Sequence, residues 1–220
     1  MTERIALVCA ALTKCRVFAD IGCDHGYMSE YMLKNGLCER AYISDISAGS
    51  LKKAERLLRK YVLAGRCIPV VANGLEGIEE ECDEVLIAGM GGTEIVEILR
   101  GRPLPKRFVL QPMKNSEKVR ALLTHRGAGI ERDFTFGKEK FYDLITGSAS
   151  GGSKYSEREL LYGRDNLKNP TPSFLGKLLH DANNLKAALA VPDFSGGRRA
   201  AVQTKLEELE ELIHETERRL

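Results

Sequence analysis

One stretch near the start of the chain decides the fold: R-V-F-A-D-I-G-C-D-H-G-Y, residues 16–27. Its first five residues have the composition of a short buried strand, and a glycine-containing turn follows them. A helix is then predicted from Tyr27 to Asn35, and Gly36 ends it. Because a strand, a glycine turn and a helix in this order open a βαβ unit, the stretch predicts a parallel sheet.

The same alternation of strand and helix continues through the first two thirds of the chain. Further strands are expected at residues 41–44, 67–72, 84–88 and 107–111, and a closing hairpin at 130–136 and 141–146. Helices are expected at residues 3–12, 47–63, 93–99 and 116–125. We therefore predict an α/β fold with an open, mostly parallel sheet, whose ligand site lies at the carboxyl ends of the strands.

The last third of the chain is predicted to be helical. The one segment with the composition of a flexible linker is S-A-S-G-G-S, residues 148–153, and the strand signal ends there. Apolar residues then recur at helical spacing over 174–189 and over 202–213, with V-P-D-F-S-G-G (191–197) between them. We expect a cofactor-binding domain over residues 1–150 and a helical domain over 151–220 that ends in an antiparallel, coiled-coil-like hairpin.

The composition is that of an ordinary globular chain. Its 220 residues are 43% hydrophobic and 29% charged, with a net charge of +2, and no apolar run approaches the roughly 18 residues of a membrane span. The first residues lack the basic region, apolar stretch and cleavage site of a signal peptide. Six cysteines occur without a C-x-x-C pair, which argues against a disulfide framework or a zinc knuckle. We therefore expect a cytoplasmic protein with reduced thiols, no membrane association and no metal.

The small net charge hides a strong local segregation of charge. Residues 100–140 hold 11 Lys and Arg against 4 Asp and Glu, and residues 49–66 hold six against one. A basic face formed by these segments would bind the phosphates of a nucleic acid, with Arg102, Lys106 and Arg107 as candidate contacts. The alternative is a set of solvated helix faces whose charges cancel in three dimensions.

The glycine loop after the first predicted strand is expected to bind a cofactor. Its glycines let the backbone approach a ligand closely, and the helix that follows offers free N–H groups. The dinucleotide fingerprint G-x-G-x-x-G is absent because Asp24 occupies its second glycine, and an acid there disfavours a pyrophosphate. S-adenosylmethionine, with a sulfonium, an amino group and one carboxylate, suits this loop better. The expected contacts are Asp20, Gly22, Asp24 and His25; a metal site formed by Asp20, Asp24 and His25 is the weaker interpretation.

The ends of the second and third strands carry further candidate cofactor contacts. Asp45 lies 25 residues after Asp20, where an acid accepts hydrogen bonds from ribose hydroxyls; the alternative is a cap on the next helix. Asn73 could reach an adenine edge and Leu75 its face, although N-G is also a common turn dipeptide. The predicted contacts at these ends are Asp45, Ile46, Asn73, Gly74 and Leu75.

The fourth strand ends in A-G-M-G-G, residues 88–92, where three glycines leave room for an approaching group. The D/N-P-P-Y/F motif of many amino-directed methyltransferases is absent, which favours an aromatic ring nitrogen as acceptor. Tyr27 could stack on that base, or it could pack under the sheet with Met28 and Tyr31. The candidate catalytic residues are Asp24, Tyr27, Gly89, Met90 and Gly91, and Gly89 is also a candidate cofactor contact.

These motifs together resemble the bacterial tRNA (adenine-N1)-methyltransferases of the TrmK family. The likeness rests on D-I-G-C-D-H-G-Y (20–27), N-G-L (73–75), I-A-G-M-G-G (87–92), L-Q-P (110–112) and G-K-E-K-F-Y-D (137–143). The opening helix, with R-I-A-L-V at residues 4–8, and the helical tail also fit the family. Three positions depart from its pattern: Gly26 replaces Ala, Ser50 replaces Pro, and Lys140-Phe141 adds a residue before Tyr142.

The resemblance implies a class I, Rossmann-like methyltransferase fold, with S-adenosylmethionine as methyl donor and tRNA as acceptor. In this family the methylated atom is N1 of adenosine 22 in the D-arm. No obligate protein partner is evident, and we expect a monomer. Two rival functions stay open. One is a nicotinamide-dependent oxidoreductase, disfavoured by Asp24; the other is a methyltransferase-fold RNA-binding module without catalysis, disfavoured by the intact Asp20, Gly22 and Asp45.

Overall fold

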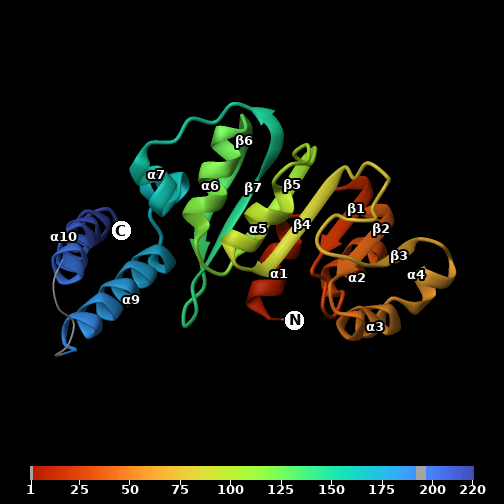
Figure 1. The fold of residues 1–220 in the computed structure, drawn as a ribbon, viewed down its shortest axis with the longest axis horizontal. Coiled ribbons are helices and arrows are strands. Elements are labelled where there is room, and N and C mark those ends of the chain that lie inside the picture. Colours follow the sequence, from red (N-terminus) through yellow and green to blue (C-terminus); the bar gives the residue numbers. More distant parts are fainter. Residues whose placement is uncertain (1, 192–196) are drawn as a thin grey trace.

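Seven strands form one sheet in the order β3-β2-β1-β4-β5-β7-β6 (Figure 1). The computed structural model describes residues 2–191 and 197–220, apart from the side chains of residues 197 and 198. The strands are β1 (Cys15–Ile21), β2 (Cys38–Asp45), β3 (Cys67–Val71), β4 (Glu84–Met90), β5 (Arg107–Pro112), β6 (Ala128–Phe136) and β7 (Tyr142–Gly151). The first five run parallel, and β7 pairs antiparallel with both β5 and β6. The predicted parallel sheet with a closing hairpin is therefore confirmed.

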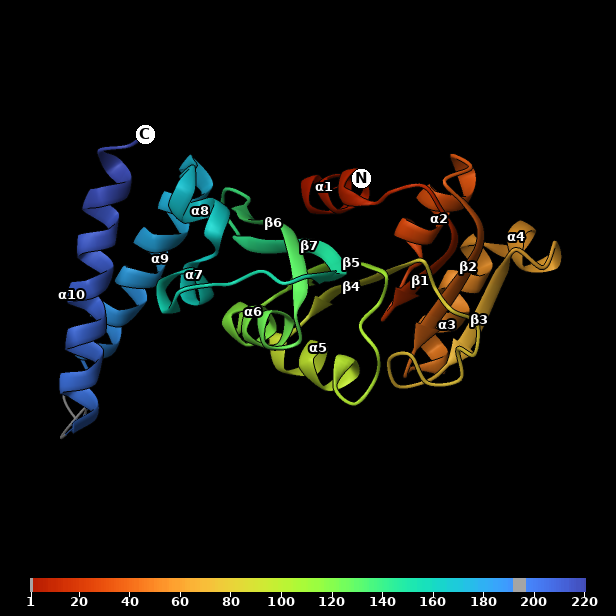
Figure 2. The ribbon, with the colours of Figure 1, turned by 90° about the horizontal axis from the view of Figure 1, so that it is seen from above.

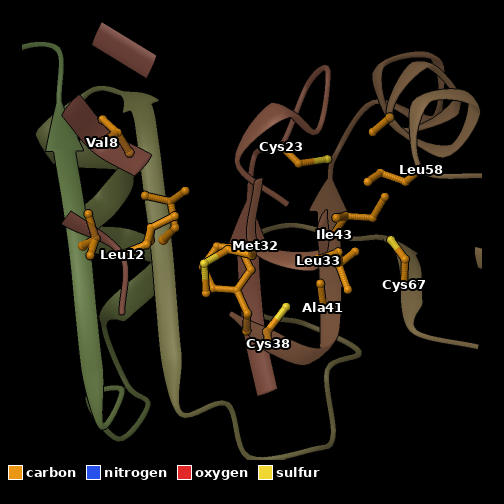
Figure 3. Close-up of a cluster of buried hydrophobic side chains, with 14 of the residues drawn as sticks. Val8, Leu12, Cys23, Met32, Leu33, Cys38, Ala41, Ile43, Leu58 and Cys67 are labelled. Atoms are coloured by element: carbon orange, nitrogen blue, oxygen red, sulfur yellow. The ribbon is translucent and has the colours of Figure 1, made fainter. Parts of the chain in front are cut away.

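Helices cover both faces of this sheet (Figure 2). One face packs against α1 (Glu3–Ala11), α2 (Tyr27–Lys34), α3 (Ala48–Leu57) and α4 (Arg59–Leu63), and the other against α5 (Gly92–Leu99) and α6 (Ser116–His125). Successive residues of β1 alternate between the two cores, as the pleat of a strand requires: Phe18 faces α1–α4, whereas Val17 and Ala19 face α5 and α6. Figure 3 shows part of the first core, in which cysteines serve as small apolar side chains.

The helix predicted over residues 47–63 is two helices, α3 and α4, separated at Leu58. Leu58 is fully buried, and its carbonyl accepts a hydrogen bond from the Tyr61 N–H at 2.8 Å, three residues later. This tighter turn brings both side chains into the core, so packing overrides the continuous helical pattern of the sequence.

The flexible linker expected over residues 148–153 is wrong for residues 148–151, because β7 continues to Gly151. Small residues here allow two strands to approach closely. A Cβ on Gly147 would collide with the Gly129 carbonyl, and a Cβ on Gly129 would lie 2.5 Å from the Ser150 carbonyl oxygen. The pairing with β6 is also irregular in this region. The glycine-rich composition therefore reflects a bulged strand pair rather than a joint.

The tail after β7 is helical, as predicted. It contains α7 (Glu157–Tyr162), α8 (Arg164–Lys168), α9 (Pro172–Leu189) and α10 (Gly197–Glu217). The last two helices pack side by side at one end of the molecule (Figure 2) around a core of their own. Residues 192–196 of the predicted connection between them lie outside the described residues. Within residues 2–191 and 197–220, no helix combines the length and the apolar character that crossing a membrane requires.

A buried ion cluster fixes the start of this tail to the sheet. Arg120 of α6 is fully buried, and its Nε donates to both carboxylate oxygens of Asp133 at 2.9 Å. Its Nη2 donates to Asp143 at 3.1 Å, and its Nη1 donates to the carbonyls of Leu160 and Leu161 in α7 at 3.2 Å. One guanidinium therefore joins α6, β6, β7 and α7.

Helix α9 also contacts the turn between β6 and β7. A Cβ on Gly176 would lie 2.8 Å from the ring of Phe141, so this ring lies against the bare backbone of the helix. Phe141 belongs to the dipeptide Lys140-Phe141, which adds one residue relative to the family pattern. The departure therefore has a structural role, because it packs the turn against the tail.

Candidate active site

A cavity of about 580 Å³ lies at the carboxyl ends of β1 to β4, where the open sheet is expected to bind a ligand. We call it the strand-end cavity. Eight of the residues singled out from the sequence line it: Gly22, Asp45, Ile46, Asn73, Gly74, Gly89, Met90 and Gly91. The other predicted site residues, Asp20, Asp24, His25, Tyr27 and Leu75, do not belong to its lining. The topology thus gathers residues from four separate strand ends.

Asp45 holds two loops together at the edge of this cavity. Its Oδ1 accepts a hydrogen bond from the Ser47 N–H at 2.8 Å, and its Oδ2 accepts one from the Asp24 N–H at 3.3 Å. Helix α3 is capped by the Ser47 hydroxyl, which accepts from the Ser50 N–H, so Asp45 is not the N-cap residue. Each carboxylate oxygen keeps a further lone pair for a ligand in the cavity.

Asp20 is buried beneath the loop and outside the cavity. Its carboxylate accepts a hydrogen bond from the Ser29 hydroxyl of α2 at 2.8 Å, which ties β1 to the helix that follows the glycine loop. Burial raises the pKa of Asp20 to about 6, against the opposing effect of the Ser29 hydrogen bond. Asp20 therefore supports the loop that forms the cavity.

Position 22 requires a glycine for two reasons, its backbone conformation and the close approach of Met90. Gly22 has a φ of 71°, and a Cβ there would collide with the terminal methyl of Met90. Gly74 is similar, with a φ of 69° and Ile98 side-chain atoms 2.8–2.9 Å from where its Cβ would be. Both glycines let side chains of the neighbouring β4–α5 region pack directly on the loops.

Asp24, His25 and Tyr27 form an exposed group beside the cavity. An oxygen of Asp24 lies 2.7 Å from His25 Nδ1, and the rings of His25 and Tyr27 stack at 5.4 Å between centroids. Tyr27 is 45% exposed, so the alternative that it packs in the core is wrong. It lines a separate cavity of about 520 Å³ formed with residues of α1 and α2.

The three glycines after Ala88 have different surroundings. Gly89 has a φ of 82°, and a Cβ there would lie 3.4 Å from Arg4 Nη1. A Cβ on Gly91 would meet the flexible ends of the Glu94 and Lys114 side chains, whereas one on Gly92 would collide with the backbone carbonyl of Asn115. Gly89 is therefore the position of the three with the most room beside it, whereas Gly92 allows close packing against the Asn115 backbone.

Two arginines take positions at the site that were not expected: Arg4 was not singled out from the sequence, and Arg102 was predicted only as a phosphate contact. Arg4 of α1 donates from Nη1 to Oε1 of Gln111, at the end of β5, at 2.9 Å. Arg102 lines the strand-end cavity and donates from Nη1 to the carbonyl of Leu75 at 3.1 Å. Arg4 and Gln111 occur in the quoted motifs R-I-A-L-V and L-Q-P. Their contact could not be predicted from these motifs, because the two residues have a sequence separation of 107.

The basic segment 100–140 is partly neutralised in the fold, as the alternative interpretation of its charges predicted. Lys106 lies 3.3 Å from both Glu81 and Asp83. Arg107 binds Glu131 through two hydrogen bonds of 3.0 and 3.1 Å. With Arg102 bound to a backbone carbonyl, the three proposed phosphate contacts are all engaged within the protein.

The sheet order, the antiparallel β7 and the cavity at the strand ends define a Rossmann-like methyltransferase fold. Residues 1–145 match the family model described as "Methyltransferase domain", and the chain belongs to this family. It is 30% identical, over 155 residues, to the tRNA (adenine(22)-N(1))-methyltransferase of Bacillus subtilis. That match spans 68% of this chain and 65% of the relative.

Two solved structures extend the similarity over nearly the whole chain. A protein in the NADB-Rossmann superfamily from Streptococcus agalactiae has a TM-score of 0.88 and 27% identity, covering 97% of each chain. A putative tRNA (m1A22) methyltransferase from Streptococcus pneumoniae, in complex with S-adenosyl-L-methionine, has a TM-score of 0.86 and 25% identity. It covers 97% of this chain and 100% of that one. The predicted fold and the resemblance to the TrmK family are confirmed by these matches.

Proposed function

We propose that this protein transfers a methyl group from S-adenosylmethionine to N1 of an adenine in tRNA, namely adenosine 22 of the D-arm. The observation that carries the proposal is the strand-end cavity, which unites the candidate residues of four strand ends on this fold. The relatives named above supply the acceptor: one is a tRNA (adenine(22)-N(1))-methyltransferase, and another is a putative tRNA (m1A22) methyltransferase.

The charges that line the cavity suit a cationic cofactor. Four carboxylates line it, from Asp45, Glu76, Glu94 and Glu97, against two arginines, Arg100 and Arg102. A net negative lining favours a sulfonium and disfavours the pyrophosphate of a nicotinamide dinucleotide. This supports a methyltransferase over the rival oxidoreductase.

The chain has residues suited to each part of S-adenosylmethionine. Asp45 would accept hydrogen bonds from the ribose hydroxyls, and Asn73 would reach the adenine edge, as expected from the sequence. Gly22 and Gly89 line the cavity, and the absence of a side chain at Gly89 allows a ligand to approach the backbone closely. When bound, this cofactor supplies an electrophilic methyl group.

Catalysis by this site would rest on orientation. Adenine N1 carries a free lone pair at neutral pH, so the chain needs no base to deprotonate it. The residues must instead hold the ring nitrogen in line and keep water away, while the carboxylates of the cavity stabilise positive charge. Since N1 lies on the Watson–Crick edge, the nucleotide must leave its stack, and exposed Tyr27 would receive the unstacked base.

The decisive experiment is mass spectrometry of nucleosides from tRNA that has been incubated with the protein and labelled S-adenosylmethionine. We expect label in 1-methyladenosine, and none when the tRNA carries guanosine at position 22. No labelled nucleoside would support the non-catalytic RNA-binding alternative, and label in another nucleoside would overturn the proposed acceptor.

The domain division, the oligomeric state and the location are also part of the proposal. We assign residues 1–150 to the methyltransferase domain and 151–220 to a helical domain, in a monomer that acts in the cytoplasm on tRNA. Light scattering of the purified protein checks the monomer, because a dimer would have twice the chain mass of 24.4 kDa.

A further inference from the structure

Another cavity, of about 500 Å³, lies between the first turn of α1 and the turn that joins β6 to β7. We call it the turn cavity. Its charged lining residues are Glu3, Arg4, Lys138, Glu139 and Lys140, and Tyr142 and Phe136 are its aromatic ones. Its cations outnumber its carboxylates, so it differs in sign from the strand-end cavity.

Arg4 lies at the border of the two cavities and is held there. Its hydrogen-bond acceptor, Gln111, is fully buried, and the Gln111 Nε2 donates to the Pro112 carbonyl at 3.2 Å. This second bond fixes the orientation of the amide, so Oε1 points to Arg4. The guanidinium carbon lies 5.9 Å from the ring centroid of Tyr142, and Nη1 borders Gly89 of the strand-end cavity.

The three cations of the turn cavity lack a carboxylate partner among the residues that the structure describes. Within residues 2–191 and 197–220, neither Arg4 nor Lys138 nor Lys140 forms an ion pair. Arg107 and Arg120, by contrast, are both bound to acids. An arginine held by a neutral amide keeps its full charge for an anion that comes from outside.

We infer that the turn cavity binds the phosphate of the nucleotide that is methylated, through Arg4, Lys138 and Lys140. The inference rests on the proposed function and adds the place where the RNA backbone is held. Methylation at N1 gives the adenine a positive charge, so a guanidinium facing the base would oppose the reaction. The same guanidinium facing the phosphate binds it with charge-assisted hydrogen bonds, while the base extends past Gly89.

The test measures tRNA affinity as a function of salt, together with methylation kinetics. For the variant Lys138→Ala/Lys140→Ala we expect a Kd for tRNA that is roughly 3- to 10-fold higher, with a salt slope reduced by up to about one unit. Affinity for S-adenosylhomocysteine, measured by calorimetry, should stay at the wild-type value and shows that the variant is folded. The matched control is Lys14→Ala, which removes an exposed lysine at the amino edge of the sheet. We expect this variant to keep the salt slope of the wild type.

Variants of Arg4 and its partner separate charge from packing. Arg4→Ala should lower kcat/KM for tRNA about 10- to 100-fold and reduce the salt slope, whereas Arg4→Lys should retain the slope. Gln111→Glu gives Arg4 a carboxylate partner without removing the guanidinium. It should therefore lower the slope as Arg4→Ala does, which a purely structural role of Arg4 would not produce.

The outcomes separate this inference from the proposed function. If the wild type methylates tRNA while all these variants keep its salt slope and KM, the phosphate site is wrong and the function stands. If the wild type neither binds nor methylates tRNA, both are overturned. Reduced slopes in the lysine and Arg4 variants, with Lys14→Ala unchanged, support the phosphate site.

Discussion

In the β1–β4 half of the molecule, polar side chains border a cavity and keep hydrogen-bonding capacity, whereas in the β6–β7 half they satisfy one another. Asp45 uses one lone pair of each oxygen on loop amides and faces the strand-end cavity. Arg120 has acids and carbonyls on all three of its nitrogens and no exposure to solvent. The first arrangement is suited to a ligand, and the second to stability.

The comparison shows how to interpret buried charge in this fold. Asp20 and Arg120 are both buried, but Asp20 has a single hydroxyl as its side-chain partner, while Arg120 has two carboxylates. Burial without a counter-ion raises the pKa of Asp20, whereas, despite the opposing effect of burial, the two carboxylates beside Arg120 raise the pKa of its guanidinium and fix the elements around it. The predictions below test this contrast.

The largest effect is expected from removing the guanidinium of the ion cluster. Arg120→Met leaves Asp133 and Asp143 buried without a cation, so the free energy of unfolding should fall by about 3–5 kcal/mol, as measured by urea denaturation. The control is Arg16→Met, whose exposed ion pair with Glu80 is screened by solvent and should matter much less. Equal losses in the two variants would mean that the cluster does not secure the β6–β7 half.

The next effect is a pH dependence that originates at Asp20. Its pKa of about 6 in the folded protein exceeds the value of about 4 in an unfolded chain. Its contribution to stability is therefore complete below pH 4 and is lost as the pH rises through 6, a loss of about 3 kcal/mol. Asp20→Asn should thus gain stability relative to the wild type between pH 4.5 and 7.

A second variant sharpens this test. The Ser29 hydroxyl stabilises the charged form of Asp20, so Ser29→Ala should make the loss of stability over the same pH range steeper. Denaturation curves at several pH values measure both effects. Parallel curves for the wild type and Asp20→Asn would show that Asp20 titrates as in an unfolded chain.

The next effect separates the two roles considered for Asp45. Asp45→Ala should weaken the binding of S-adenosylhomocysteine by about 1–3 kcal/mol, because charge-assisted hydrogen bonds to the ribose are lost. Ser47→Ala removes the actual cap of α3 and should cost about 1 kcal/mol of stability with little change in affinity. Calorimetry and thermal melting measure the two quantities. Asp45 would be a loop residue only, if Asp45→Ala bound the ligand as the wild type does.

The smallest effect on stability is expected at Tyr27. Because its ring is half exposed, Tyr27→Ala should change the free energy of unfolding by less than about 1 kcal/mol. If the ring stacks on the target base, the same variant should lower kcat/KM for tRNA. The expected loss of transition-state stabilisation is about 1–3 kcal/mol. Wild-type kinetics would remove Tyr27 from the acceptor site.

The sequence was most informative for site residues that can each be identified from the pattern around a single strand end. Gly22, Asp45, Asn73 and Gly89 each follow or end a strand, and the parallel topology alone brings strand ends together. These residues could be chosen from local patterns, because glycines with positive φ and polar residues after buried strands are local features.

Other features could not be predicted because they depend on tertiary contacts between distant residues. The contact of Arg4 with Gln111 and the pairing of Arg107 with Glu131 arise only when separate elements meet. Residues 148–151 of the predicted linker form a strand for the same reason, since Gly151 lies directly against Gly129 of the paired strand. Local composition limits the conformations that a segment can adopt, and tertiary contacts with neighbouring elements determine which of these conformations forms.

The contact between Phe141 and Gly176 also has a consequence for how such sequences can vary. The ring occupies the space that a side chain at 176 would need, so a larger residue at one position requires a smaller one at the other. The two positions are 35 residues apart in the chain, and they should change together among close relatives. In an alignment, the residues at positions 141 and 176 would identify the relatives in which the β6–β7 turn packs against α9 as it does in this protein.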